Sequence, residues 1–406
     1  MRENSLNHQH NRTIRIFCRI LSTRLIDSRG RGRLYLSQQA AADTPPKDAK
    51  AGACDLGWNG ALAPAPDAIR GVLMTYDPSW DRPHRPSAES NWQESDCYWF
   101  FDIDRRIGGF HRIGQKPNLG SGQVTAFVFA EGGERYVLND SYSNHRAISE
   151  ADRWETGHRV DGHVAEALGD QKMRFSWDEP DCSAKLEFYE SFHTPRNWSK
   201  TGHSDKFMDN INSDGHLECA GKLRGTIRIG EQIYEIDALA HRDRSWGFRD
   251  NGRVSMHRYR MFSGTVGPEL SFASFLLDLK NGPKMVAGFV SRHGVDMDVR
   301  DLRVVTAFDA DGLSPMGATA ILTLEDGEKV KIDCDGVQGF MTPVPEAGAV
   351  SSDTISTFTY QGKTGFLDLE LSTNPGRGVY IPTPEDLTVL AIAPGLSACA
   401  SYDLTN

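Results

Sequence analysis

Short strand-like runs joined by glycine-containing turns recur along this chain, and they constrain its fold more than any other feature. Two runs of alternating apolar and polar residues that flank a tight turn are typical of a β-hairpin. Five such pairs are present: residues 124–130 with 135–138, 226–229 with 232–236, 271–279 with 285–290, 318–324 with 330–334, and 356–360 with 364–371. The pattern predicts an antiparallel all-β protein.

The pattern of alternation and turns in the rest of the chain supports the same fold class. Alternation is clear in residues 185–190 and 366–371, which suits sheets with one wet face. Residues 148–155 are the one candidate for a short helix, so a parallel α/β sheet is excluded. Gly120-Ser121-Gly122 precedes a strand and not a helix, which predicts a turn and not a phosphate-binding loop.

We expect two folded domains after an N-terminal extension. Residues 1–36 carry eight arginines and two acids, against a net charge of −10 for the whole chain, and residues 40–66 are rich in Ala, Pro and Gly. A transit peptide, a disordered extension and a non-native extension before Met74 are the alternatives, and we favour the last two. The polar segment 197–215 places a domain boundary near residue 220. The predicted domains are therefore 74–220 and 221–406, after an extension of residues 1–73.

Composition excludes several classes of partner. A net charge of −10 argues against nucleic acid and anionic membranes, and no apolar run is long enough to span a bilayer. Seven scattered cysteines without a Cys-x-x-Cys pair suit free thiols in the cytoplasm. No histidine spacing predicts a metal site, so we expect neither metal nor cofactor. A monomer or homodimer is expected.

The segment His241–Asp250 is the densest candidate site, with sequence His-Arg-Asp-Arg-Ser-Trp-Gly-Phe-Arg-Asp. Arginines can stack on an indole ring and form paired bonds with carboxylates. Two interpretations stay open. The segment could close one end of a barrel by packing arginine over Trp246, or it could form the polar wall of a pocket.

Three further clusters could contribute to such a pocket. Gly108 and Gly109 indicate a bulge or a close backbone approach, from which His111 and Arg112 would project into a pocket; a surface turn is the alternative. Alternation places two other pairs on common faces. These are His216 with Glu218, either an orienting pair or a cross-strand contact, and His257 with Tyr259.

Three motifs together resemble the AttH-like and carotenoid 1,2-hydratase superfamily. They are Gly109-Phe110-His111-Arg112-Ile113-Gly114 with Pro117-Asn118, then His216-x-Glu218, then Arg242-Asp243-x-Ser245-Trp246-Gly247-x-Arg249-Asp250. The resemblance covers Asp77 to about Leu371. It implies two lipocalin-like β-barrel or sandwich domains in tandem around an apolar ligand, such as a terpenoid, a steroid or a prenylated aromatic molecule. It also implies hydratase or isomerase activity, although some relatives guide ring closure and others have no assigned reaction.

The resemblance and the residue chemistry together give a first mechanistic hypothesis. Asp243 would be a carboxylic acid with a raised pKa, and His241 or His257 would activate water. The ligand would contact Trp246, Arg249, Tyr259, Phe110, His111, Arg112, His216 and Glu218.

Two features complicate this hypothesis. A regular strand would point Asp243 and Trp246 to opposite faces, so the hypothesis requires a bulge at residues 245–247. Arg242 and Arg244 would lower the pKa of an adjacent Asp243, and relatives often carry histidine where this chain has Arg244, a fixed cation. A non-catalytic carrier of an apolar molecule and a cyclase that acts by shape are the alternatives.

Overall fold

The computed structural model describes residues 75–139, 145–198, 214–249, 256–279, 284–308, 315–344, 349–373 and 389–391. Within these ranges the chain is almost entirely β-strand, and the helices are the short 3-10 turns η2 (Pro78–Asp81), η3 (Pro117–Leu119) and η4 (Glu150–Asp152). The all-β prediction is confirmed, and residues 148–155 contain only η4. The predictions for residues 1–73 fall outside the described residues.

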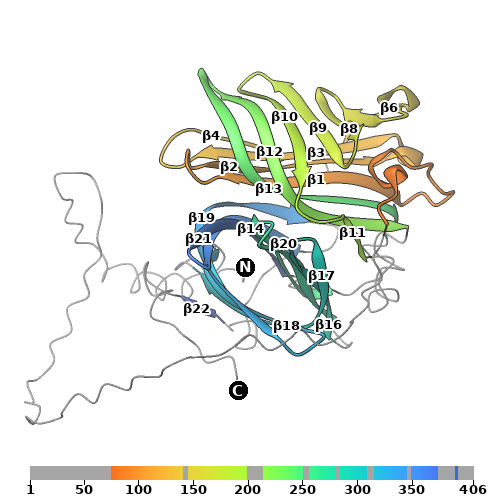
Figure 1. The fold of residues 1–406 in the computed structure, drawn as a ribbon. Coiled ribbons are helices and arrows are strands. Elements are labelled where there is room, and N and C mark those ends of the chain that lie inside the picture. Colours follow the sequence, from red (N-terminus) through yellow and green to blue (C-terminus); the bar gives the residue numbers. More distant parts are fainter. Residues whose placement is uncertain are drawn as a thin grey trace, which may run out of the picture. The chain divides into compact units, whose positions relative to one another are not determined.

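The N-terminal sheet is antiparallel and strongly curved (Figure 1). Its main path runs β4-β3-β2-β1-β13-β12-β10-β9-β8-β7-β6, with β5 beside β3 and β11 beside β12. The bounds are β1 Trp92–Asp102, β2 Ile107–Lys116, β3 Ser121–Ala130, β4 Arg135–Asn139, β5 Arg146–Ala147, β6 Arg153–Trp154, β7 Gly157–Val160, β8 His163–Gly169, β9 Lys172–Glu179, β10 Cys182–Ser191, β11 Arg196–Asn197, β12 Gly215–Ile229 and β13 Gln232–Phe248. Because β2 also contacts β7 and β8, the sheet curls around one face, which encloses an apolar core that includes Phe100, Phe175 and Leu223.

The second sheet is an eight-stranded antiparallel barrel, which the pairing of β16 with β17 closes (Figure 1). Its strands are β14 Met256–Gly267, β15 Leu270–Leu279, β16 Lys284–Arg292, β17 Val295–Phe308, β18 Pro315–Leu324, β19 Lys329–Val344, β20 Ala349–Tyr360 and β21 Lys363–Thr373, and β22 (Val389–Ala391) adds in parallel to β17. Phe262, Phe272, Leu322, Leu367 and Leu369 belong to the barrel's apolar core. All five predicted hairpins are present, as β3–β4, β12–β13, β15–β16, β18–β19 and β20–β21.

The change from one sheet to the other comes between Phe248 and Met256, later in the chain than the predicted boundary near residue 220. Strand β12 runs unbroken through residue 220, because Gly221 allows close packing against the ring of Phe188 and the backbone of Glu190. The polar segment 197–215 therefore interrupts the N-terminal sheet and does not end it.

The two sheets meet through an aromatic cluster. From the N-terminal sheet come Trp99, Phe110 and Phe127, and from the barrel Phe340 and Phe366. The ring centroid of Phe340 lies 5.5 Å from that of Phe110 and 4.9 Å from that of Phe127. One face of the N-terminal sheet is thus directed toward the barrel, and we call it the barrel-facing side. The opposite face is the enclosed side.

Candidate functional site

Strand β13 distributes the segment 241–250 over both faces of the sheet. Each residue from Leu239 to Phe248 pairs with one residue of β1, so the register is continuous and the predicted bulge at residues 245–247 is absent. Asp243 therefore lies on the barrel-facing side, whereas Arg242, Arg244 and Trp246 lie on the enclosed side. The two arginines do not flank the Asp243 side chain, because alternation turns them away from it.

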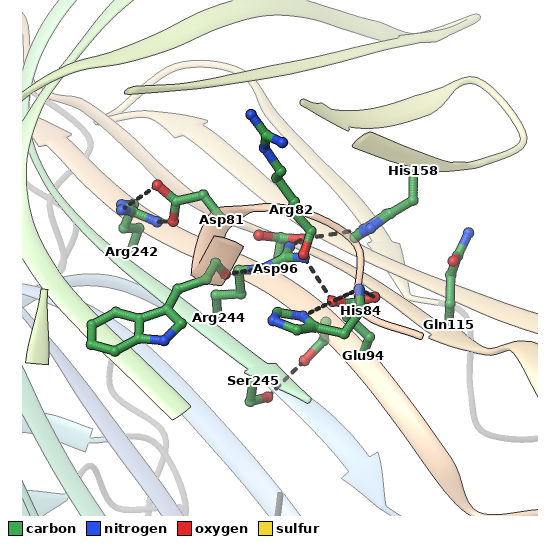
Figure 2. A network of polar contacts seen from close by, with 12 residues as sticks. Asp81, Arg82, His84, Glu94, Asp96, Gln115, His158, Arg242, Arg244 and Ser245 are labelled. Atoms are coloured by element: carbon green, nitrogen blue, oxygen red, sulfur yellow. Dashed lines mark hydrogen bonds and ion pairs between the residues drawn. The ribbon is translucent and has the colours of Figure 1, made fainter. Parts of the chain in front are cut away.

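On the enclosed side the arginines are held in a buried ionic network (Figure 2). Arg242 donates to Asp81 at 2.7 Å, and Arg244 donates to Glu94 at 2.7 Å and to Asp96. Arg244 also donates to the backbone oxygen of Trp80 at 2.9 Å. Segment 75–86, which contains η2, is thereby fastened across the sheet.

The ring of Trp246 belongs to the same network. It stacks on His84 with a centroid distance of 3.9 Å and covers Gly215, where a side chain would collide with the indole. Burial alone would raise the pKa of Glu94, but Arg244, His84 and Arg153 outweigh it and hold the pKa at about 2. For Arg242, Arg244 and Trp246 this geometry favours the barrel-closing interpretation over the pocket-wall interpretation.

His111 also points to the enclosed side, where its Nε2 lies 2.9 Å from Nδ1 of His163 and its ring stacks on Trp177. The register of β2 is continuous, so the glycines before it make no bulge. Gly109 instead permits a close backbone approach, because a Cβ there would collide with the carbonyl oxygen of Phe127. His111 is therefore separated by the sheet from its sequence neighbours Phe110 and Arg112, which lie on the barrel-facing side.

On the barrel-facing side the structure brings together a histidine–carboxylate cluster of His216, Glu218, His241 and Asp243. Nε2 of His216 lies 2.7 Å from Oδ2 of Asp243 and 3.3 Å from Oε1 of Glu218, and Nε2 of His241 bonds Oε2 of Glu218. Burial would lower the pKa of His216, but Asp243 and Glu218 outweigh it and raise the pKa to about 10. His216 is thus positively charged at neutral pH and lies against two carboxyl side chains, those of Asp243 and Glu218.

Apolar and basic side chains border this cluster. The ring of Trp99 lies 6.3 Å from that of His241, and Phe110 packs against Trp99 at 5.1 Å. The guanidinium of Arg112 packs over Gly114, and a side chain at residue 114 would collide with that guanidinium. The cluster therefore sits beside the aromatic contact between the two sheets.

An acidic trio on the barrel, Asp353, Asp368 and Glu370, was not predicted. Burial raises the pKa of Asp353 to about 7 even though Trp99 donates to it at 3.4 Å. Burial, together with Asp353 and Glu218, also raises the pKa of both other carboxyls well above the usual range. The alternation of residues 366–371 already placed Asp368 and Glu370 on one face of a strand, but nothing in the sequence showed that a second sheet covers that face.

The other predicted site residues lie nearby or outside what can be described. Arg249 follows β13 and lowers the pKa of Glu370, which places its positive charge near the acidic trio. His257 and Tyr259 lie on β14, but their side chains are outside the described residues.

A protein-family model, the domain of unknown function DUF7064, matches residues 77–375. The chain belongs to the DUF7064 family. The match spans both sheets, so this DUF7064 protein carries the histidine–carboxylate cluster and the acidic trio within one family domain. No curated protein matches its sequence.

Two solved structures share the fold of the DUF7064 chain. An AttH-type protein of Nitrosomonas europaea is 12% identical and has a TM-score of 0.51, with 75% of this chain and 98% of that chain covered. CghA, solved with Sch210972, is 11% identical with a TM-score of 0.50, covering 74% and 96%. The predicted AttH-like fold is confirmed. Among the described residues there is no helix long and apolar enough to cross a bilayer.

Proposed function

We propose that the histidine–carboxylate cluster binds an apolar small molecule and acts on it as a hydratase or isomerase by acid–base chemistry. The observation that carries the proposal is the pairing of His216 with Asp243, both partly buried, and of His241 with Glu218, both fully buried, beside the aromatic contact between the sheets. Histidine–carboxylate pairs hold one ring nitrogen and leave the other available for proton transfer. The presence of a small molecule in CghA, which shares the fold, also supports a ligand-binding role.

The hydrogen bonds assign different tasks to the two histidines. A carboxylate can only accept, so Nε2 of His241 must donate to Glu218, and Nδ1 is the ring nitrogen that remains to accept a proton. This Nδ1 is buried and makes no hydrogen bond among the described residues. His241 is therefore the proposed base, and His216, oriented by Asp243, is the proposed hydrogen-bond donor.

The pKa of His216 narrows the substrate class. An imidazolium with a pKa of about 10 is too weak an acid to protonate an isolated alkene, but it stabilises negative charge on an oxygen. The ligand we propose is a steroid, terpenoid or prenylated aromatic molecule whose double bond is conjugated to a carbonyl. His241 takes a proton from water, the water oxygen bonds to the β-carbon, and the alkene electrons move to the carbonyl oxygen beside His216. The proton returns to the α-carbon, which completes the addition.

The cysteines bear on the cellular compartment. Within the described residues Cys97, Cys182, Cys219 and Cys334 are all free and buried. This supports a reducing, cytoplasmic setting for the protein. A monomer or homodimer remains the prediction for its assembly.

The test begins with native mass spectrometry of the purified full chain, which should show a co-purifying apolar molecule. With that molecule or its conjugated precursor as substrate, we expect His216→Gln to lower kcat at least 100-fold, in line with loss of a hydrogen-bond donor to the developing oxyanion. Binding should change only a few-fold, because the bordering aromatic side chains remain.

The exposed His145 provides the matched control, and His145→Gln should leave turnover unchanged. Unchanged turnover in His216→Gln would refute the assignment of His216 as the hydrogen-bond donor. A molecule that is bound but never converted by the native protein would show a carrier instead.

A further inference from the structure

The acidic trio has the donor arrangement of a cation site. Its residues lie on adjacent barrel strands, with Asp353 opposite Glu370 in the β20–β21 register. One carboxylate oxygen from each of the three residues lies within 4.8 Å of the other two. Asp353 and Asp368 are buried, and neither carboxylate oxygen of Asp368 has a hydrogen-bond partner among the described residues. Three carboxylate oxygens thus converge on one small volume.

A fourth oxygen lies beside the trio. Ser263 on β14 is the register partner of Asp368 on β21, so both side chains leave the barrel on the same face. Ser263 is fully buried, and its Oγ also lacks a hydrogen-bond partner among the described residues. A buried hydroxyl without a partner is costly unless something else satisfies it.

Electrostatics also favour a positive charge here. Glu218 acts repulsively on Asp368 and Glu370, and Asp243 acts repulsively on Glu370, so two further carboxylates add negative potential from the N-terminal sheet. Buried carboxylates are retained in proteins when they are paired, protonated or bound to metal. Arg249 acts attractively on Glu370 and offsets part of this negative potential.

We propose that Asp353, Asp368 and Glu370, together with the hydroxyl of Ser263, bind one hard divalent cation. An all-oxygen donor set selects Mg²⁺, Mn²⁺ or Ca²⁺ over the softer metals that prefer nitrogen and sulfur. The site goes beyond the proposed function and does not depend on it, because the histidine–carboxylate pairs are separate side chains on the other sheet. This proposal departs from the expectation of no metal, which was drawn from histidine spacing.

Trp99 offers a direct readout of this site. Its Nε1 lies 3.4 Å from Oδ1 of Asp353, so excitation of Trp99 should sensitise Tb³⁺ bound by the trio. With the full chain, we expect saturable Tb³⁺ emission that Mn²⁺ or Ca²⁺ displaces. Asp368→Asn should weaken Mn²⁺ binding at least tenfold, measured by electron paramagnetic resonance. Loss of a direct metal ligand should lower the affinity at least as much as loss of a residue that only hydrogen-bonds a ligand.

Two variants make the result specific. Asp301→Asn, on the exposed outside of the barrel, should leave Mn²⁺ binding unchanged. Trp99→Phe should abolish Tb³⁺ emission while Mn²⁺ still binds. The proposal is overturned if the native chain binds neither ion, or if Asp368→Asn and Asp301→Asn bind Mn²⁺ as the native chain does. Circular dichroism of each variant establishes that it is folded, and Ser263→Ala provides a second, milder lesion that should also weaken Mn²⁺ binding.

Discussion

At the scale of single residues, alternation along β13 separates two kinds of chemistry that are adjacent in sequence. Asp243 faces the barrel and pairs with His216, whereas Arg242 and Arg244 turn to the enclosed side and pair with Asp81, Glu94 and Asp96. The first set forms part of the histidine–carboxylate cluster on which the proposed function rests. The second set holds residues 75–86 against the sheet. Replacing a residue of this set should therefore change the free energy of unfolding more than it changes ligand chemistry.

Glu94→Gln tests the stabilising role of the enclosed network. Glu94 is fully buried and pairs with Arg244 and Arg153, so the variant leaves buried positive charge uncompensated and should cost about 3–5 kcal/mol at pH 7. Because the folded pKa is lowered from 4.5 to about 2, this stabilisation is present above pH 4.5 and is lost as the pH falls toward 2.

Urea unfolding of both proteins from pH 7 to pH 2 measures the effect. Glu325→Gln in an exposed turn should be neutral. A difference between native chain and Glu94→Gln that stays constant down to pH 2 would contradict the ionic assignment.

Individual residues also show which parts of the candidate sites could be predicted from the sequence. Pairing His216 with Glu218 on one face was predictable from alternation, and the structure adds His241 and Asp243 from the neighbouring strand. Asp353 and Asp368 could not be found, because their burial depends on a contact between two sheets that no local pattern encodes. The raised pKa of His216 could not be found for the same reason, because it depends on Asp243, a partner that is distant in sequence.

At the scale of elements, the strands follow the pattern of turns closely. The five hairpins could be predicted from the sequence because glycine turns and alternation are local signals. The position at which the second sheet begins could not be predicted. A polar segment between two strands has the same composition whether the next strand joins the preceding sheet or begins a new one. Strand β12 returns, and with β13 it brings the site residues to the centre of the N-terminal sheet.

Gly109→Ala tests the close approach of β2 to β3. A Cβ at residue 109 would collide with the carbonyl oxygen of Phe127 and lie 3.1 Å from Cα of Val128, and backbone atoms cannot move aside cheaply. We expect a loss of about 1–3 kcal/mol in the free energy of unfolding. Gly133→Ala is the control, because its Cβ would meet Ala130 at an ordinary 3.5 Å. Equal stability of the two variants in urea would contradict the close approach.

At the scale of the whole described fold, the two sheets share one aromatic cluster and several polar contacts. Arg196 bonds Asp296 at 3.4 Å, and Trp198 packs against Phe275 at 4.6 Å, so strands on both sides of the contact are linked. Both proposed sites lie along this contact. Their geometry therefore depends on the sheets folding as one unit.

Phe340→Ala tests that dependence. Removing this ring from between Phe110 and Phe127 should cost about 3–5 kcal/mol, as for other buried phenylalanines. All eight tryptophans precede residue 256, so tryptophan emission reports the N-terminal side and, through Trp99 and Trp198, its contact with the barrel. Hydrogen exchange of peptides from residues 256–373 reports the barrel. We expect both probes to shift together in urea. A shift confined to the barrel probe would show that the sheets unfold independently.

The pairing of β1 with β13 also determines the order in which the protein can form during synthesis. Ser95 and Ser245 bond across this pair although they are 150 residues apart. In the barrel each strand from β14 to β20 pairs with the next one along the chain, and β14 also pairs with β21. As the chain emerges from the ribosome, β1 keeps an open edge until β13 has been translated, and an open edge is a template for wrong partners. The histidine–carboxylate cluster, carried on β12 and β13, is therefore complete only when that edge is closed.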